Sequence, residues 1–316
     1  MISYAIRRIL YGLLVLFMVT TFVFVTLRAI PGDVVRLQLA DAPGVTQEQV
    51  DALAAELGLD QPVLTQFWSF ITSAVTGDLG TSFETRQPVT EMILERLPAT
   101  LELGLLAIIF SVLLGVPLGI ISAIKNNSIV DQSLRLVSVA GISIPNFWLA
   151  LLLITYLSIW FGWSQPLVYA APWEDLGTNL SIMAIPALAL GTSAMASVSR
   201  MLRSSMLEVT QSNFVRTVRA RGAPESLVIL KHAGRNSILP VFTLLGLQFG
   251  NILGGTVILE SIFSIPGMGS LIFSSVQMRD YPVVLGCVIF YGGVFIFVNL
   301  LVDLCYALID PRIRYS

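Results

Sequence analysis

Several side chains that donate or accept hydrogen bonds interrupt long apolar stretches of this sequence. Gln248 and Asn251 are three residues apart and Asn299 and Asp303 are four apart, so each pair shares one face of a helix. Polar groups inside such stretches point to function, because leaving them in hydrocarbon is costly. We expect them either to line a hydrophilic path or to hydrogen-bond between helices. The candidates for such a path are Asn146, Ser193, Gln248, Asn251, Asn299 and Asp303.

Residues for covalent or nucleotide chemistry do not occur in the arrangements that such chemistry needs. A phosphate-binding loop requires a lysine directly after glycine, and neither Lys125 nor Lys231 follows one. To act as a protease nucleophile, Ser193 would need a histidine at hydrogen-bond distance within the same apolar region. The only histidine, His232, lies in a basic segment instead. The two cysteines show no metal-ligand spacing. We therefore expect no catalytic residue, no metal site and no cofactor on this chain.

The composition predicts an integral membrane protein. Of the 316 residues 55% are hydrophobic and only 12% are charged, whereas a soluble domain has about 25% charged residues. The net charge of -2 provides no basic field that would favour nucleic acid as a partner. About 20 apolar residues are needed to cross the hydrocarbon layer. Six such runs are present, approximately Ile9 to Ile30, Thr100 to Ile124, Leu134 to Phe161, Ile182 to Met201, Ile238 to Leu259 and Val283 to Ile309.

The distribution of basic residues predicts the orientation of these six spans. Most of the 18 basic residues lie in the N-terminus, around residues 125–135 and 200–236, and in the C-terminus. The positive-inside rule then places both termini in the cytoplasm. We expect an all-α polytopic protein of an inner membrane, with the first span in residues 1–30, an extracytoplasmic subdomain in 31–97 and a core in 98–316 that carries a cytoplasmic segment, 202–236.

The acidic outer segment, residues 31–97, has its own helix signals. Thr46 with Gln49 three residues later forms a capping box, and Gly58 can end the helix that follows. A second short helix is expected around Gln66 to Ala74. This small helical insertion would act either as a solvated lid or as a docking surface for a partner.

Prolines and glycines predict where the spans bend and where they pack closely. Pro117, Pro145, Pro186 and Pro240 each lie in a span and each removes one backbone donor. Glycines four residues apart allow helices to approach closely. We expect close packing at two such series, Gly115 with Gly119, and Gly246 with Gly250 and Gly254.

The basic segment between the fourth and fifth spans predicts two short helices separated by a Gly-Ala-Pro break at residues 222–224. Phe214 and Val218 share one face, with Arg216, Arg219 and Arg221 beside them. By itself this pattern fits an amphipathic helix on the lipid surface and a helix that contacts a protein partner equally well.

Residues 214–222, Phe-Val-Arg-Thr-Val-Arg-Ala-Arg-Gly, with Leu-Lys-His-Ala-Gly-Arg-Asn-Ser-Ile-Leu-Pro at 230–240, resemble the coupling segment of bacterial ABC permeases of the dipeptide/oligopeptide/nickel family. The resemblance is to the B-type permease subunit and extends over nearly the whole chain. Further matching stretches lie at residues 7–10, 31–33, 57–62, 77–80, 97–100, 264–269, 279–282 and 310–312. The chain departs from the general permease signature, because Arg216-Thr217-Val218 stands where that signature has Glu-Ala-Ala, as in the peptide-type subfamily.

This resemblance implies a permease subunit that forms the pathway of an ATP-driven importer for peptides or a similar small solute. The implied partners are a second homologous permease, two ATP-binding subunits that hold ATP and magnesium, an extracytoplasmic solute-binding protein and membrane lipid. Pro266, Gly267, Met268 and Gly269 would belong to an external gate. The residues that would contact the ATP-binding subunit are Arg216, Thr217, Arg219, Ala220, Arg221, Gly222, Ala223, Pro224 and Glu225.

An ion-coupled secondary transporter is the alternative, with Glu102 or Asp303 as the coupling carboxylate. The sequence does not distinguish dipeptides, longer peptides, glutathione, nickel chelates or sugars as the solute.

Overall fold

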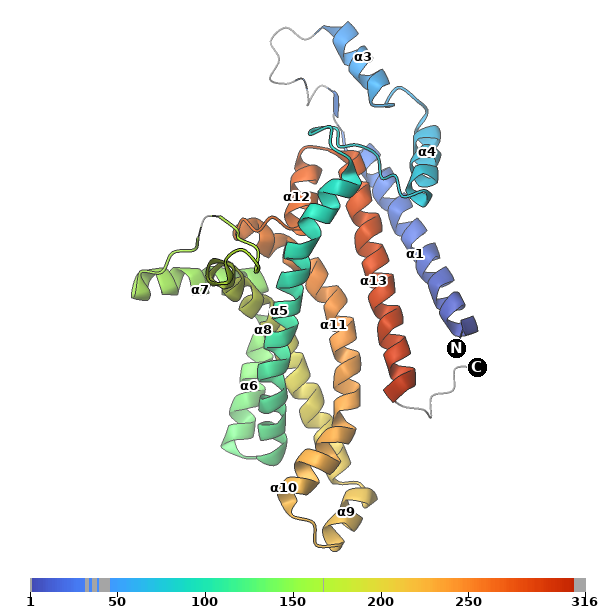
Figure 1. The fold of residues 1–316 in the computed structure, drawn as a ribbon. Coiled ribbons are helices and arrows are strands. Elements are labelled where there is room, and N and C mark those ends of the chain that lie inside the picture. Colours follow the sequence, from blue (N-terminus) through green and yellow to red (C-terminus); the bar gives the residue numbers. More distant parts are fainter. Residues whose placement is uncertain (1, 32–33, 36–38, 40–45, 167, 310–316) are drawn as a thin grey trace. The chain divides into compact units, whose positions relative to one another are not determined.

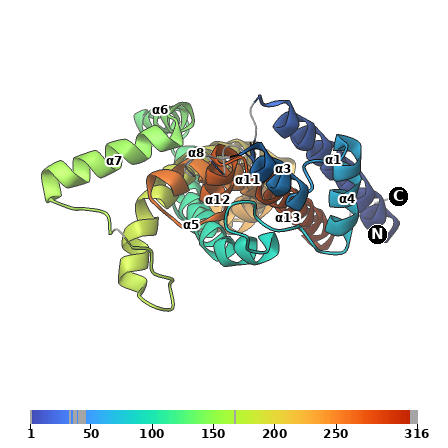
Figure 2. The same ribbon diagram turned by 90° about the horizontal axis from the view of Figure 1, so that it is seen from above.

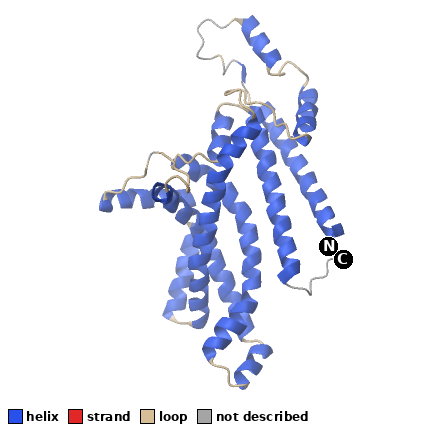
Figure 3. Cartoon of the chain, in the orientation of Figure 1, coloured by secondary structure: helices blue, strands red, loops and turns tan. Residues whose placement is uncertain are grey.

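The computed structural model describes the backbone of residues 2–31, 34–35, 39, 46–166 and 168–309. Within these ranges the chain is helical and no strand is present (Figure 3). Five helices are long and apolar enough to cross a membrane, and a bent pair of helices brings the number to six. This confirms the expected all-α membrane fold. The side chains of Asp303 and Cys305, and residues 310–312 of the matching C-terminal stretch, lie outside the described part.

The chain forms two compact units. The first contains residues 1–98 and 266–300, and the second contains residues 99–265 and the end of the last helix. Helices α5 (Val89–Ile124) and α13 (Tyr281–Ile309) contribute to both units. The three-part division expected from the sequence stays a prediction.

In the first unit, α1 (Ile2–Ala29) packs on the N-terminal part of α13. A Cβ added to Gly292 would lie 2.4 Å from Leu16, so glycine is what allows this approach. The two helices expected in the outer segment are present, as α3 (Gln47–Glu56) and α4 (Val63–Val75). The Thr46 capping box is formed, and Gly58 follows α3 with φ +65.

The second unit is built around α8 (Leu176–Thr210), the most buried of the long helices (Figure 1). It packs against α6 (Ile129–Ser143), α7 (Asn146–Phe161) and α11 (Arg235–Ile262). Three short elements connect α8 to α11, namely α9 (Asn213–Ala220), α10 (Glu225–Leu227) and a π-helical turn, Val228–Gly234. Pro186 and Pro240 lie inside continuous helices.

The third expected span, residues 134–161, is not one helix. It is divided into α6 and α7, which are bent by 104° at a short break (Figures 1 and 2). Pro145 precedes α7 with an extended backbone, and the residue before a proline disfavours the helical region. The proline therefore ends the helix instead of only bending it.

The expected close approach at Gly115 and Gly119 is present. A Cβ at Gly115 would lie 2.8 Å from the Met195 carbonyl oxygen, and one at Gly119 would lie 2.8 Å from the Ser199 carbonyl oxygen. Both carbonyls belong to α8. In the second glycine series Gly246 lies against Val302, whereas Gly254 has no atom within 4 Å of an added Cβ.

We expect Gly119→Ala to destabilise the chain by about 1–3 kcal/mol, because the added methyl group meets a backbone carbonyl that cannot move aside. Gly254→Ala is the matched control, since the same methyl group enters open space there. Thermal unfolding in detergent should give a lower midpoint for Gly119→Ala and an unchanged or higher midpoint for Gly254→Ala. Equal midpoints for the two variants would contradict this packing.

Candidate functional site

The segment between α8 and α11 folds as a compact turn of helices because each of its breaks has a local cause. The Ser212 hydroxyl oxygen accepts a hydrogen bond from the Val215 N–H and so caps α9. Val215 is fully buried and fixes one face of α9. Gly222 then adopts φ +79, which only glycine adopts without strain. The predicted pair of short helices with a Gly-Ala-Pro break is therefore confirmed.

An ion pair spans this break. Arg219 donates from Nη2 to Glu225 Oε1 at 2.6 Å and from Nε to Glu225 Oε2 at 3.1 Å. Its Nη1 also donates to the Thr210 carbonyl oxygen at 3.3 Å, which ties the turn back to the end of α8. The hydrogen bonds that Arg219 donates to the Glu225 carboxylate raise the pKa of Arg219. The pair thus holds the turn closed from its exposed side.

The remaining residues predicted to contact a partner lie on the surface of this turn. Arg216, Thr217, Ala220, Arg221 and Pro224 are exposed, and Ala223 is half-buried. Phe214, with 51% of its surface exposed, stacks edge-on against His232. The segment therefore presents a basic outer face on a fixed apolar base.

The base of this segment is packed into the second unit. Leu202 and Met206 of α8 and Val241 of α11 form a buried cluster, and Ile120 and Ile229 pack against it. Ile229 lies in the π-helical turn, which the sequence analysis did not predict. This turn belongs to the same packed body as α8.

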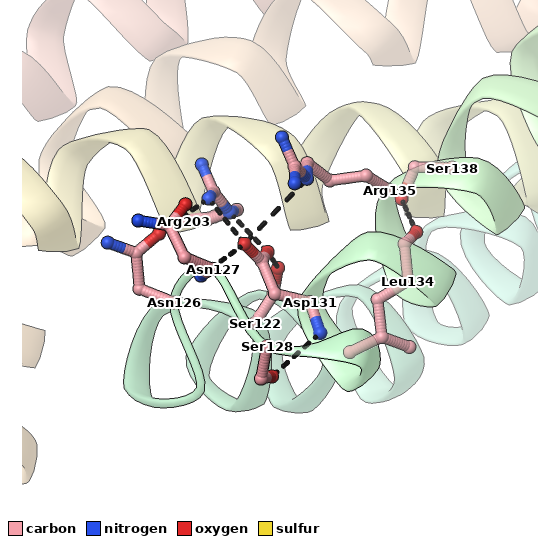
Figure 4. Close-up of polar contacts among 9 residues, drawn as sticks. All are labelled: Ser122, Asn126, Asn127, Ser128, Asp131, Leu134, Arg135, Ser138 and Arg203. Carbon is pink, nitrogen blue, oxygen red and sulfur yellow. Dashed lines mark hydrogen bonds and ion pairs between the residues drawn. The ribbon is translucent and has the colours of Figure 1, made fainter.

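A second polar cluster includes Arg203, which follows Leu202 of this base in the chain (Figure 4). The Asp131 side chain is fully buried, and Arg203 donates to both of its oxygens, at 2.7 and 2.8 Å. The Ser122 hydroxyl donates to it at 2.6 Å and the Asn127 N–H at 3.0 Å. Sequence reasoning missed Asp131, although an acid standing alone in a basic segment between two spans was a usable signal.

The structure does not bring the predicted path residues together in one hydrogen-bonded group. In the second unit, Asn146 begins α7, Ser193 lies in the middle of α8, and Gln248 and Asn251 lie on α11. Among the described contacts no hydrogen bond links these four residues. In the first unit the Asn299 amide donates to the Phe295 carbonyl of its own helix at 2.8 Å. Their role as a path stays a prediction.

The four predicted gate residues lie where α12 (Met268–Gln277) begins. Met268 is 1% exposed and packs with Val283 and Cys287, while Pro266 is half-buried. Nearby in the chain, the buried Asp280 carboxylate accepts hydrogen bonds from the Ser82 hydroxyl at 2.5 Å and from the Phe83 N–H at 3.0 Å. Residues 82–83 are thereby held to residue 280 within the first unit.

Two further carboxylates in the second unit are paired with hydroxyl groups. Glu260 is fully buried in α11 and accepts a hydrogen bond from the Thr100 hydroxyl at 2.8 Å. The sequence analysis ended that span at Leu259 and so missed Glu260. Glu102, considered above as an ion-coupling group, accepts a hydrogen bond from the Tyr169 hydroxyl at 2.8 Å.

Comparison with known proteins assigns the chain to a family. Residues 115–315 match the family described as binding-protein-dependent transport system inner membrane component, and residues 1–104 match its N-terminal family. The chain is 40% identical over 316 residues to the glutathione transport system permease protein GsiC of Escherichia coli O6:H1. It is 39% identical to the protein of the same name from Escherichia coli K12 and from Shigella dysenteriae serotype 1. Each match covers 100% of both chains.

Two solved structures have a similar fold. The inward-facing MetNI methionine ABC transporter matches with a TM-score of 0.53 and 15% identity, covering 69% of this chain and 96% of that one. An amino acid ABC transporter matches with a TM-score of 0.51 and 17% identity, covering 71% of this chain and 95% of that one. The full-length sequence match and this common fold agree that the chain belongs to the binding-protein-dependent transport system inner membrane component family, as a multi-pass permease subunit of a bacterial ABC importer.

Proposed function

We propose that this chain forms part of the translocation pathway of an importer for small peptides, with glutathione among the solutes. The observation that carries the proposal is the 40% identity, over the full length of both chains, to a glutathione transport system permease. A family of permeases that depends on binding proteins also implies that an extracytoplasmic protein delivers the solute. The ion-coupled alternative is set aside because this family membership accounts for the whole chain.

The proposed assembly contains a second homologous permease and two ATP-binding subunits, which hold ATP and magnesium. The sequence supports this division of labour, since no lysine follows a glycine in a phosphate-binding loop. Apolar side chains on α7 support a second permease or lipid as neighbours, because Trp148, Trp160 and Phe161 are largely exposed in the single chain. Nucleic acid is not among the proposed partners.

The basic face of the turn at α9 and α10 is the proposed contact with an ATP-binding subunit. Arg216, Arg219 and Arg221 are exposed there and would meet acidic groups of that partner. The buried Val215 and the positive φ of Gly222 give the turn one defined shape. We propose that closure of the ATP-binding subunits moves this turn, and with it α8 and α11, so that the pathway and the gate at residues 266–269 change state.

We expect Gly222→Pro and Arg219→Glu to abolish coupled uptake while membrane insertion is retained. Proline cannot adopt a positive φ, and the glutamate both breaks the ion pair and reverses the charge of the docking face. Uptake by vesicles containing the assembled importer is the measurement, with copurification of the ATP-binding subunits as a second readout.

The double variant Arg219→Glu with Glu225→Arg separates the two effects, since it restores the ion pair with reversed polarity. If the turn geometry alone matters, this variant should recover uptake. If the partner reads the charge at residue 219, it should stay inactive. Normal uptake in both single variants would count against the coupling assignment.

The solute proposal is tested by uptake and competition. We expect vesicles containing the assembled importer and its binding protein to take up labelled glutathione and short peptides in an ATP-dependent way. Each solute should reduce the uptake of the other when added in excess, since both would use one pathway. Uptake of only a sugar or a nickel chelate would contradict the peptide assignment without contradicting the family.

We propose that both termini and the α9–α10 turn face the cytoplasm and that α3 and α4 face outward, as the positive-inside rule predicts. Single cysteines at the exposed residues Glu84 and Arg221, in a chain with Cys287→Ser and Cys305→Ser, test this topology. A membrane-impermeant maleimide should label Glu84→Cys in intact cells, and should label Arg221→Cys only after the membrane is opened. The reverse pattern would invert the topology.

A further inference from the structure

We propose that the buried Asp131–Arg203 ion pair joins the α5–α6 turn to the C-terminal part of α8 as one rigid unit. Movement received by the α9–α10 turn would then reach α6 and α7. Asp131 and Arg203 are then positioning residues for transport. The proposal rests on the proposed function, because it assumes that the α9–α10 turn is where motion enters.

The geometry of the pair resists rotation (Figure 4). Arg203 donates from Nε to Asp131 Oδ1 at 2.7 Å and from Nη2 to Asp131 Oδ2 at 2.8 Å. Two parallel hydrogen bonds between planar groups set the orientation of both side chains as well as their distance. A single hydrogen bond or a lysine ammonium group would set only the distance.

Each oxygen of the carboxylate has a further donor from the α5–α6 turn. The Ser122 hydroxyl, near the end of α5, donates to Oδ1 at 2.6 Å, and the Asn127 N–H donates to Oδ2 at 3.0 Å. Arg203 Nη2 also donates to the Asn126 side-chain oxygen at 2.9 Å. The guanidinium group of α8 is therefore bonded to both sides of the turn, and Arg135 lies 3.7 Å from Oδ2 as an additional cation.

Burial makes these bonds hard to exchange for water. The Asp131 side chain is 0% exposed and that of Arg203 is 18% exposed. A buried carboxylate that loses its partner cannot be solvated without opening the surrounding packing. The pair therefore holds α6 to α8 throughout any motion that leaves this region folded.

The Asp131–Arg203 pair lies between the α9–α10 turn and the bent pair of helices, α6 and α7. Arg203 lies between Leu202 and Met206, which are buried against α11 and the π-helical turn. On the other side, Asp131 lies in the first turn of α6, whose Gly141 lies close to Thr192 of α8. A displacement of the C-terminal part of α8 thus moves the whole length of α6 with it. Helix α7 begins at the break that follows α6.

The distance between the turn and α8 tests this inference directly. Nitroxide labels at the exposed residues Lys125 and Glu208, in the background with Cys287→Ser and Cys305→Ser, report the distance between the α5–α6 turn and α8. In the assembled importer we expect a narrow distance distribution that is the same with and without a non-hydrolysable ATP analogue. Asp131→Asn should broaden it.

Transport per ATP hydrolysed gives the functional readout. For Asp131→Asn we expect the ratio of solute imported to ATP hydrolysed to fall at least about fivefold while ATP hydrolysis continues. Arg203→Lys keeps the charge but not the two parallel bonds, so it should lie between wild type and Asp131→Asn. If the Asp131→Asn protein does not accumulate, the ratio measured for Arg203→Lys tests the proposal instead. Arg200→Gln, on an exposed arginine of the same helix, is the matched control and should leave both readouts unchanged.

A purely structural role predicts a different result, namely loss of ATP hydrolysis and transport in proportion, with the distance distribution unchanged in the protein that remains. That result, or an unchanged ratio in Arg203→Lys and Asp131→Asn, would overturn the inference. Failure of the chain to copurify with ATP-binding subunits would instead contradict the proposed function. The label distances in the purified chain would still report whether the pair makes this region rigid.

Discussion

The backbone hydrogen bonds of the apolar spans are satisfied within helices, because hydrocarbon offers no other partner, and the rest of the architecture depends on that constraint. An unpaired N–H or C=O group in hydrocarbon is expensive, so every helix end needs a partner. Among the described helices, side chains provide it at four starts, where Thr46, Ser128, Asp175 and Ser212 accept hydrogen bonds from the first turns of α3, α6, α8 and α9. At Pro145 the helix is not continued, and the chain breaks there into two helices of different direction.

The same cost governs the charged groups and gives the Asp131–Arg203 and Arg219–Glu225 ion pairs of the second unit different properties. Removing one partner of a buried pair costs about 3–5 kcal/mol, which applies to Asp131 and Arg203. The Arg219–Glu225 pair is exposed on both sides, and such pairs add little stability because water screens the two charges. An exposed pair can be rearranged when a partner docks, whereas the buried pair cannot follow without local unfolding. The difference in burial thus separates the ion pair that can rearrange from the ion pair that stays rigid.

The sequence predicted those features that depend on local rules. The Thr46 capping box, the end of α3 at Gly58, the short α4 and the Gly-Ala-Pro break all follow from nearby residues, and all are present. What it could not predict depends on residues far apart in the chain. Asp131 and Arg203 are 72 residues apart and Thr100 and Glu260 are 160 apart, so no spacing rule connects them. The 104° bend was underestimated because a proline in an apolar run fits both a kink and a break.

The separation between Asp131 and Arg203 also has a consequence for biogenesis. Ribosomes add about 5–20 residues per second, so the 72 residues between them take about 4–14 s to synthesise. During that interval the Asp131 carboxylate lacks the two hydrogen bonds from Arg203, has only Arg135 as a nearby cation, and must stay hydrated. The turn after α5 therefore has to wait at the water-facing boundary of the bilayer until α8 has been inserted. The buried pair can then form only after α8 is in place, and it would mark a chain that has been inserted as far as α8, with α11 and α13 still to follow in the sequence.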